Sequence, residues 1–98
     1  MKSNFNEIIN SETPVLVDFY AEWCGPCKTL ISILEEVKSE LGDAIKIIKI
    51  DVDKNHLLAT NYRVKSVPTL VLFNDGNQVW RQSGVLQKGD LIKVLQSH

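Results

Sequence analysis

The sequence is poor in cysteine, in charge of one sign and in long hydrophobic runs, and each shortage excludes a class of protein. Two cysteines in 98 residues are far fewer than a disulfide-stapled scaffold needs. A net charge of -1 gives no electrostatic reason to bind nucleic acid or an anionic membrane. No segment approaches the roughly 18 apolar residues that indicate a membrane span. We therefore expect neither nucleic acid nor a membrane among the partners.

The N-terminal residues lack the pattern of an export signal. MKSNFNEIINSETPVLVDFY contains no apolar run of signal-peptide length beside a basic start, so we expect a cytoplasmic location. No internal repeat, low-complexity run or Pro/Gly/Ser linker divides the chain. Because 98 residues suffice for one hydrophobic core, residues 1–98 are predicted to form a single domain.

Helical and strand patterns alternate along the chain, as they do in α/β proteins. Apolar residues at three- and four-residue spacing predict an amphipathic helix that begins at Pro26 and is ended by Gly42. The apolar run VLVDFY before it predicts a strand buried on both faces. The other predicted elements are a short helix at 4–10, a strand at 44–53, a short helix at 54–64, two strands around the turn 74–77 and a closing helix at 88–97.

The order of these elements limits the topology of the sheet. A strand, helix and strand in succession favour a parallel pair joined by a right-handed crossover. The Asp75-Gly76 pair is a strong hairpin signal. We therefore expect a mixed sheet with strand order 3-1-2, extended by antiparallel pairing of the fourth strand and lying between helices.

Both cysteines lie in FYAEWCGPCK, where the buried strand meets the long helix. Unpaired N–H groups and the positive end of the helix dipole favour an anion at this point, and a Cys24 thiolate is such an anion. Cys27 follows one helical turn later on the same face, within reach of a disulfide. Between them, Gly25 lets a partner chain approach and Pro26 fixes the start of the helix. This context predicts a redox-active pair.

Two other interpretations fit a pair of cysteines in general. Buried cysteines can lie near each other as packing residues without any chemistry. A structural zinc site needs about four ligands, and only His56 and His98 add soft donors here, neither in zinc-finger spacing. We therefore expect no metal site.

Asp18 places a carboxyl group inside an apolar strand, six positions before Cys24. Two explanations stay open. An ion pair with Lys49 on the neighbouring strand would give the carboxylate a structural role. Alternatively, burial raises the pKa of Asp18, so that it exchanges a proton with Cys27 directly or through water.

These motifs together resemble the thioredoxin family. WCGPCK, Asp18 within VDFYAEWC, the VPT segment before the third strand, the FNDG hairpin and Gly84 before the last helix follow the family's order and spacing over nearly the whole chain. The resemblance implies an α/β thioredoxin fold, with a central mixed sheet of four to five strands flanked by helices. It also implies a cis peptide bond at Pro68, which the X-Pro pattern alone leaves open, and a position for Lys49 near Asp18.

The same resemblance implies a protein-disulfide reductase that acts as an electron carrier. The Cys24 thiolate would attack a disulfide of a substrate protein, and Cys27 would resolve the mixed disulfide, assisted by Asp18. No cofactor would be bound, because the redox-active disulfide Cys24–Cys27 carries the electrons. The implied partners are disulfide-containing proteins and a thioredoxin reductase that uses NADPH, and the chain is expected to be a monomer. The implied docking surface comprises Trp23, Gly25, Pro26, Val67, Pro68, Gly84 and Val85.

Four features depart from the family pattern. Few residues precede the first helix, so we expect the usual first strand to be missing or very short. Tyr20 stands where a tryptophan is common, which changes the polarity near the cysteines. Ser32 stands where a helix-kinking proline is common, which predicts a straighter helix. Trp80 stands where small or polar residues are usual, and we favour packing at the sheet's edge over contact with a partner.

Two alternative functions share part of this pattern. An oxidase or isomerase of an exported compartment would have the same fold, but other dipeptides between the cysteines and a signal peptide are expected there. A non-catalytic binding module would use the face around Trp23 and Pro68, but binding alone does not require two thiols. Both comparisons favour the reductase.

Overall fold

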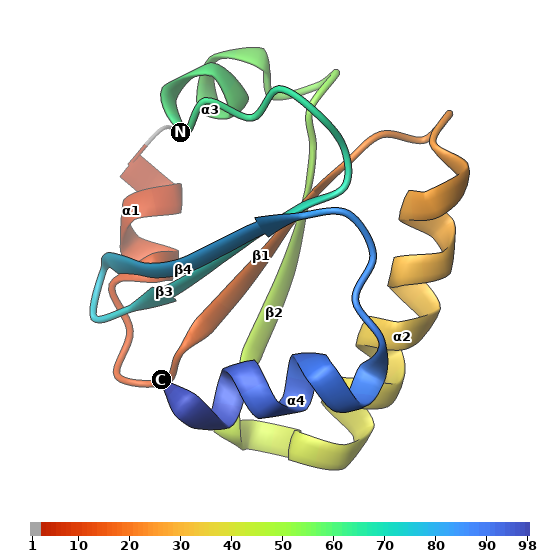
Figure 1. Cartoon of the computed structure of the whole chain (residues 1–98). Helices are drawn as coiled ribbons and strands as arrows, with labels where there is room; N and C mark the ends of the chain where they lie inside the picture. The colour runs from red at the N-terminus through yellow and green to blue at the C-terminus, as the bar shows by residue number, and fades with distance from the viewer. Residues whose placement is uncertain (1–2) are drawn as a thin grey trace.

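Residues 3–98 are described in the computed structural model of the protein, with side chains from Phe5 onward. Figure 1 shows a central sheet surrounded by helices. In chain order the elements are α1 (Ser3–Ile9), β1 (Val15–Tyr20), α2 (Gly25–Leu41), the 3-10 helix η1 (Gly42–Ala44), β2 (Lys46–Asp51), α3 (His56–Asn61), β3 (Thr69–Asn74), β4 (Asn77–Ser83) and α4 (Lys88–Ser97). None of these helices is both long and apolar enough to cross a bilayer.

The four strands of the described residues form one mixed sheet in the order β2-β1-β3-β4. β1 pairs parallel with β2 and antiparallel with β3, and β3 pairs antiparallel with β4. The predicted order 3-1-2, extended by the fourth strand, is therefore confirmed. The hairpin turn is also confirmed, since Asp75 (φ 55°) and Gly76 (φ 81°) both adopt the left-handed conformation of a two-residue turn.

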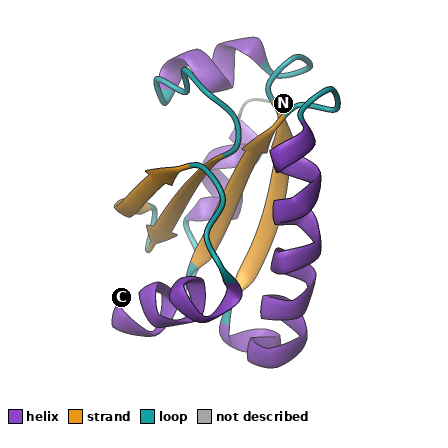
Figure 2. Cartoon of the chain, turned by 45° about the vertical axis from the view of Figure 1, so that its right-hand side comes forward, coloured by secondary structure: helices purple, strands orange, loops and turns teal. Residues whose placement is uncertain are grey.

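The central strand β1 is buried on both of its faces. Leu16 points into a cluster with buried leucines of α2 and α4. Val17 and Phe19 point into a second cluster, which includes Phe5 of α1 and Leu58 of α3. Figure 2 shows helices on both faces of the sheet, as this division requires. The continuous apolar run of β1 is thus explained by helices that cover both of its sides.

Three of the four departures from the family pattern can be located in the structure. The described chain enters α1 at Ser3 without a preceding strand, which leaves β2 at one edge of the sheet. Ser32 lies within the uninterrupted helix α2. Trp80 lies on the edge strand β4 and packs against the cluster that contains Leu34 and Leu91, as predicted. This large side chain therefore covers the edge of the core.

Two predicted elements were too long. The strand expected at 44–53 is only Lys46–Asp51, because residues 42–44 form η1 and a turn begins at Asp51. In that turn, the Asp51 carboxylate accepts a hydrogen bond from the N–H of Asp53 (2.8 Å), and the Asp51 carbonyl accepts one from the Asn55 side chain (3.0 Å). These polar contacts end β2 at Asp51, two residues before the end of the strand that the sequence predicts.

The helix expected at 54–64 is only His56–Asn61. The N–H of Arg63 donates to the Thr60 carbonyl (3.0 Å), and the N–H of Val64 donates to the Ala59 carbonyl (2.9 Å). Arg63 itself is left-handed, with φ 56°. This is the Schellman arrangement that closes helices, although glycine is the residue usually found at the left-handed position.

Gly42 ends α2 with a backbone conformation that residues other than glycine rarely adopt. Its φ is 56° and its ψ is -128°, and its N–H donates to the Lys38 carbonyl. No atom lies within 4 Å of the position a side chain would take, so only backbone strain opposes a substitution. Gly42→Ala is expected to lower the free energy of unfolding by about 1–3 kcal/mol in urea denaturation.

Gly89 provides the matched control for this substitution. It lies in the first turn of α4, with no atom within 4 Å of the added carbon and without a left-handed φ. Gly89→Ala is expected to raise the free energy of unfolding by up to about 1 kcal/mol, because alanine favours helix. Equal effects of the two substitutions would contradict the assignment of strain to Gly42.

Candidate functional site

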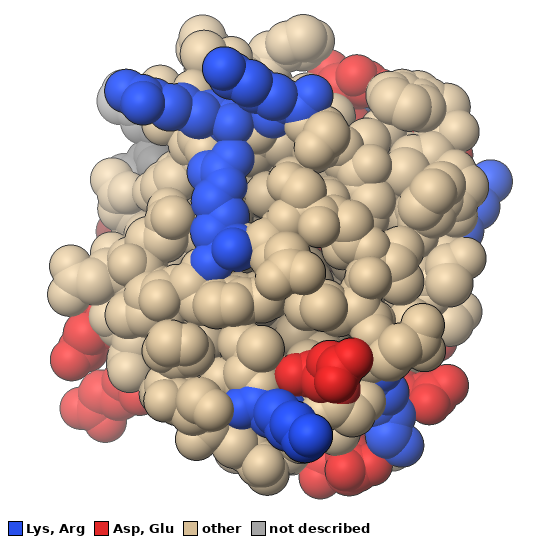
Figure 3. Space-filling model, in the orientation of Figure 1, with Lys and Arg blue, Asp and Glu red and all other residues tan. Residues whose placement is uncertain are grey.

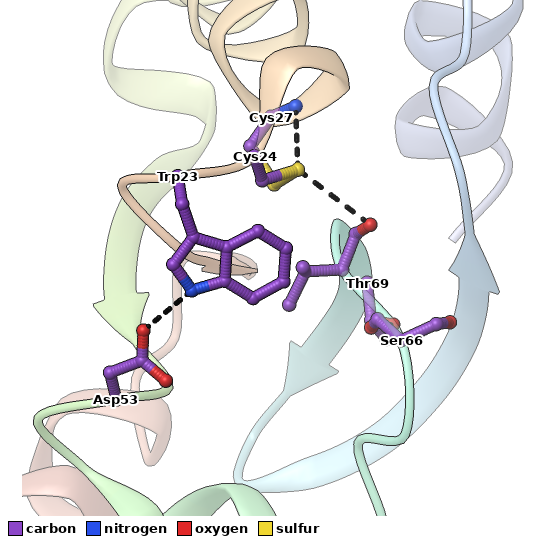
Figure 4. Close-up of a disulfide and its surroundings, with 7 residues drawn as sticks. Trp23, Cys24, Cys27, Asp53, Ser66 and Thr69 are labelled. Carbon is purple, nitrogen blue, oxygen red and sulfur yellow. Dashed lines mark hydrogen bonds between the residues drawn. A yellow bond between two sulfur atoms is a disulfide. The ribbon is translucent and has the colours of Figure 1, made fainter.

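The two cysteines form a disulfide at the N-terminus of α2. Cys24 is the N-cap residue of the helix, and the Cα atoms of Cys24 and Cys27 lie 5.3 Å apart. The N–H of Cys27 donates to the Cys24 sulfur at 3.1 Å, as Figure 4 shows. One of the helix's unpaired N–H groups is therefore directed at this sulfur, where it would stabilise a negative charge in the reduced protein.

The two sulfurs differ in how open their surroundings are. Cys24 is 4% exposed and Cys27 is fully buried. Gly25 and Pro26, which lie between them, are exposed. No atom lies within 4 Å of the position that a side chain on Gly25 would take. The surface next to Cys24 is therefore open on the Gly25 side, while Cys27 stays covered.

The loop before β3 faces the disulfide. The Val67–Pro68 peptide bond is cis, as the family resemblance implies. The Val67 carbonyl oxygen lies 3.8 Å from the Cys24 sulfur. The N–H of Gly84 donates to the Pro68 carbonyl at 2.9 Å, which brings Gly84 and Val85 beside this loop. Val67, Gly84 and Val85 are partly exposed, whereas Pro68 is buried, so the surface here is formed by its neighbours and not by its ring.

Trp23 is the most prominent apolar side chain near the cysteines, with 72% of its surface exposed. Its indole N–H donates to the Asp53 carboxylate at 2.8 Å, which fixes the ring on the surface (Figure 4). Beside the ring is an open pocket of about 160 Å³, lined by Trp23, Val52, Val64, Lys65, Ser66 and Val67.

Asp53 is the residue of this site that the sequence analysis missed. It follows the end of β2 by two residues, and Trp23 follows the end of β1 by three. Because the carboxyl ends of neighbouring parallel strands meet at one edge of a sheet, this proximity could have been inferred from the topology.

Asp18 is fully buried in the middle of β1. It lies on the same face of the strand as Leu16, which packs beneath the helix that carries Cys27. Neither carboxyl oxygen has a hydrogen-bond partner among the described residues. Burial raises the pKa of Asp18 from 3.8 to about 7, opposed by the positive charge of Lys49.

Lys49 lies directly opposite Asp18 in the register of β1 and β2. Its side chain is exposed, and no ion pair joins it to Asp18 within the described part of the chain. The structural explanation of Asp18 as half of an ion pair is therefore wrong. Lys49 acts on Asp18 only through its longer-range charge.

The described residues contain no group of three or more His, Cys, Asp or Glu side chains placed to hold a metal ion. The groups of the site whose chemistry can be derived from the structure are the disulfide and the buried carboxyl group. The disulfide can accept two electrons to become a dithiol that passes them on, and the carboxyl group can accept a proton near neutral pH.

Comparison with known proteins gives consistent similarities. The family model described as thioredoxin matches residues 1–97. A thioredoxin-like protein of Synechocystis is 52% identical over 95 residues, which are 96% of this chain and 90% of that protein. A thioredoxin of Rickettsia prowazekii is 45% identical over 87 residues, or 89% of this chain and 83% of its own. The solved structure of a mutant thioredoxin from Halobacterium salinarum superposes with a TM-score of 0.88 at 39% identity, covering 97% of this chain and 82% of that one.

The raised pKa of Asp18 predicts how stability depends on pH. The unfolded chain releases this proton near pH 3.8 and the folded chain near pH 7, so the folded state loses stability as pH rises between these values. Asp18→Asn is expected to raise the free energy of unfolding at pH 8 by up to about 4 kcal/mol, because no charge is then buried. The gain should shrink toward zero as pH falls to about 4.

Asp43→Asn provides the control for this pH series, because Asp43 is an exposed carboxylate in η1. Denaturant unfolding of both variants and the wild type between pH 4 and pH 8 measures the effect. A stabilisation by Asp18→Asn that is the same at both ends of the range would contradict the raised pKa.

Proposed function

Because the chain belongs to the thioredoxin family and is therefore a protein-disulfide oxidoreductase, we propose that Cys24 and Cys27 reduce disulfides in other proteins. The Cys24 thiolate attacks one substrate sulfur, which breaks the substrate disulfide, forms a mixed disulfide and releases the other sulfur as a thiolate. Cys27 then attacks Cys24, which frees the second substrate sulfur and closes the Cys24–Cys27 disulfide. Two electrons pass to the substrate, and the described structure corresponds to the oxidised product.

The observation that carries this assignment is the difference between the two sulfurs. Cys24 receives the N–H of Cys27 at 3.1 Å and is the more exposed of the pair. A hydrogen bond from a helix N-terminus favours the thiolate, and Cys24 is the one of the two cysteines that keeps some exposed surface, next to the exposed Gly25. Cys27 is buried, so it meets the mixed disulfide only from within the protein.

Asp18 fits the role of proton acceptor for Cys27. A carboxyl group with a pKa of about 7 is partly ionised at neutral pH, and it has no competing hydrogen-bond partner among the described residues. It accepts the Cys27 proton, directly or through water, as Cys27 attacks the mixed disulfide. Lys49 is a positioning charge in this scheme, since it favours the ionised form of Asp18.

The docking surface in this proposal surrounds Cys24. It comprises the exposed Trp23, Gly25 and Pro26 and the partly exposed Val67, Gly84 and Val85, with Pro68 buried beneath them. An extended segment of the substrate pairs with the backbone at Val67, whose carbonyl lies close to the Cys24 sulfur. The exposed indole of Trp23 contributes apolar contact beside it.

After each exchange the Cys24–Cys27 disulfide has to be reduced again before the protein can act on another substrate. A thioredoxin reductase that uses NADPH returns the oxidised pair to the dithiol, and the protein acts as a monomeric electron carrier. We place this cycle in the cytoplasm, where protein thiols are kept reduced. Residues 1–98 act as one domain, and no bound cofactor takes part in the exchange.

Insulin reduction with NADPH and thioredoxin reductase tests the roles of the two cysteines. Cys24→Ser is expected to abolish activity, because the attacking thiolate is lost. Cys27→Ser is expected to accumulate a mixed disulfide that mass spectrometry detects, because nothing resolves it. Activity retained by Cys24→Ser would end the proposal. Activity with dithiothreitol but none with the reductase would remove only the recharging step.

Asp18→Asn tests the proton acceptor separately from stability. Resolution of a mixed disulfide with a fluorescent peptide is expected to slow at least about 10-fold at pH 7 in this variant. In the wild type the rate should rise with pH through about 7, as Asp18 loses its proton, and the variant should lack this rise. Asp43→Asn is the control with an exposed carboxylate, and normal turnover by Asp18→Asn would contradict the role.

A further inference from the structure

Charge is unevenly divided along this chain. Residues 54–89 contain five Lys or Arg residues and a single acidic residue, Asp75, although the whole chain has a net charge of -1. This segment includes α3, β3, β4 and the loop with Val67. The side of the site built from it is therefore cationic on an otherwise acidic protein.

Two of these five cations have acidic partners elsewhere. Lys54 lies 3.9 Å from Glu22, and Lys88 lies 3.0 Å from Glu40. The other three, Arg63, Lys65 and Arg81, have no acidic partner among the described residues, and we call them the cationic surface. Figure 3 shows Lys and Arg side chains gathered over α3 and β4 at the upper left of the molecule.

Contacts within the structure hold this surface together. The Arg81 guanidinium donates to the carbonyls of Tyr62 and Arg63, the second at 2.7 Å, so it joins β4 to the end of α3. Arg63 occupies a left-handed position (φ 56°) where glycine would be less strained. The side chain of Arg63 and the guanidinium of Arg81 therefore both carry positive charge at the end of α3.

Lys65 is the residue of the cationic surface that lies in the pocket beside the cysteines. It lines the same pocket as Trp23 and Val67, and the Val67 carbonyl lies 3.8 Å from the Cys24 sulfur. Two residues of extended chain span at most about 7 Å. A substrate segment that pairs with the backbone at Val67 would therefore bring residues close to its own cysteine against Lys65.

We propose that the cationic surface selects protein substrates that carry Asp or Glu two or three residues from the disulfide to be reduced. This inference rests on the proposed function and names the class of substrate for it. Acidic side chains complement three cations that lack acidic partners among the described residues, and the attraction speeds encounter with the correct orientation. Three cations on one surface, with Lys65 in the pocket that Trp23 and Val67 also line, suit a short acidic segment, whereas nucleic acid would meet the acidic remainder of the molecule.

The test uses three peptides with the same disulfide and with Glu, Gln or Lys at the second and third residues from one cysteine. Pre-reduced protein is mixed with each peptide in a single turnover, so no reductase is needed. The Glu peptide is expected to react about 5- to 10-fold faster than the Gln peptide at low salt, and the Lys peptide slower than both. At about 0.5 M NaCl the ratio should approach one.

Variants locate the preference on the surface. For each variant the rate with the Glu peptide is divided by the rate with the Gln peptide. A general change in thiol reactivity affects both rates equally and cancels in this ratio. Arg63→Gln and Lys65→Gln are each expected to lower this ratio about twofold or more, and Lys65→Glu should favour the Lys peptide. Arg81 is left unchanged because it holds the end of α3. Lys93→Gln removes an exposed charge on α4 and should leave the ratio unchanged.

The outcomes separate the two proposals. Equal rates for the Glu and Gln peptides in the wild type would overturn the substrate preference while leaving the reductase intact. A ratio that falls as much in Lys93→Gln as in Lys65→Gln would also overturn it, since net charge alone would then explain the effect. Failure to reduce any of the peptides would overturn the proposed function itself.

Discussion

The pairing of β1 with a strand on each side is the constraint on which the site depends. β1 is parallel to β2 and antiparallel to β3, with Tyr20 opposite Asp51 and Phe19 opposite Thr69. The ends of β1 and β2 and the beginning of β3 must therefore lie at one edge of the sheet. The residues just beyond these ends are the ones that meet there: the start of α2 with its disulfide, the turn with Asp53 and the cis Val67–Pro68 peptide.

The same strand carries the group that opposes stability most directly. Asp18 is fully buried without a hydrogen-bond partner in the described residues, in a position that apolar side chains would fill more favourably. Its apolar neighbours Leu16, Val17 and Phe19 are also fully buried, and each contributes about 1.5–3 kcal/mol. β1 can therefore tolerate one carboxyl group because the rest of the strand holds it in the core. The raised pKa follows from that burial, so proton acceptance near pH 7 and reduced stability have a single cause.

Local patterns in the sequence predicted the elements whose limits are set by burial. The apolar run of β1, the amphipathic face of α2 and the Asp-Gly turn were recognised with their partners in the sheet. The ends of β2 and α3 were missed because individual hydrogen bonds decide them, the Asp51 carboxylate in one case and the left-handed Arg63 in the other. Within the site, the cysteines and Asp18 stand out by residue type and context. The position of Asp53 near Trp23 follows from the parallel pairing that the sequence predicts, although the hydrogen bond between the two side chains does not. The exposed side chain of Lys49 could not be predicted, since only the folded arrangement determines whether it meets Asp18.

Chemistry and substrate selection come from different parts of this chain. The reactive groups lie on β1 and the first turn of α2, where burial and the helix N-terminus fix their properties. The cationic surface, which has no acidic partner among the described residues, lies between residues 63 and 81, on the end of α3, the loop that follows it and the edge strand β4. No side-chain hydrogen bond or ion pair joins Arg63 or Lys65 to the cysteines or to Asp18 in the described residues. Substitutions at these exposed positions can therefore change the choice of substrate while the helix N-terminus and the buried carboxyl group keep their environment.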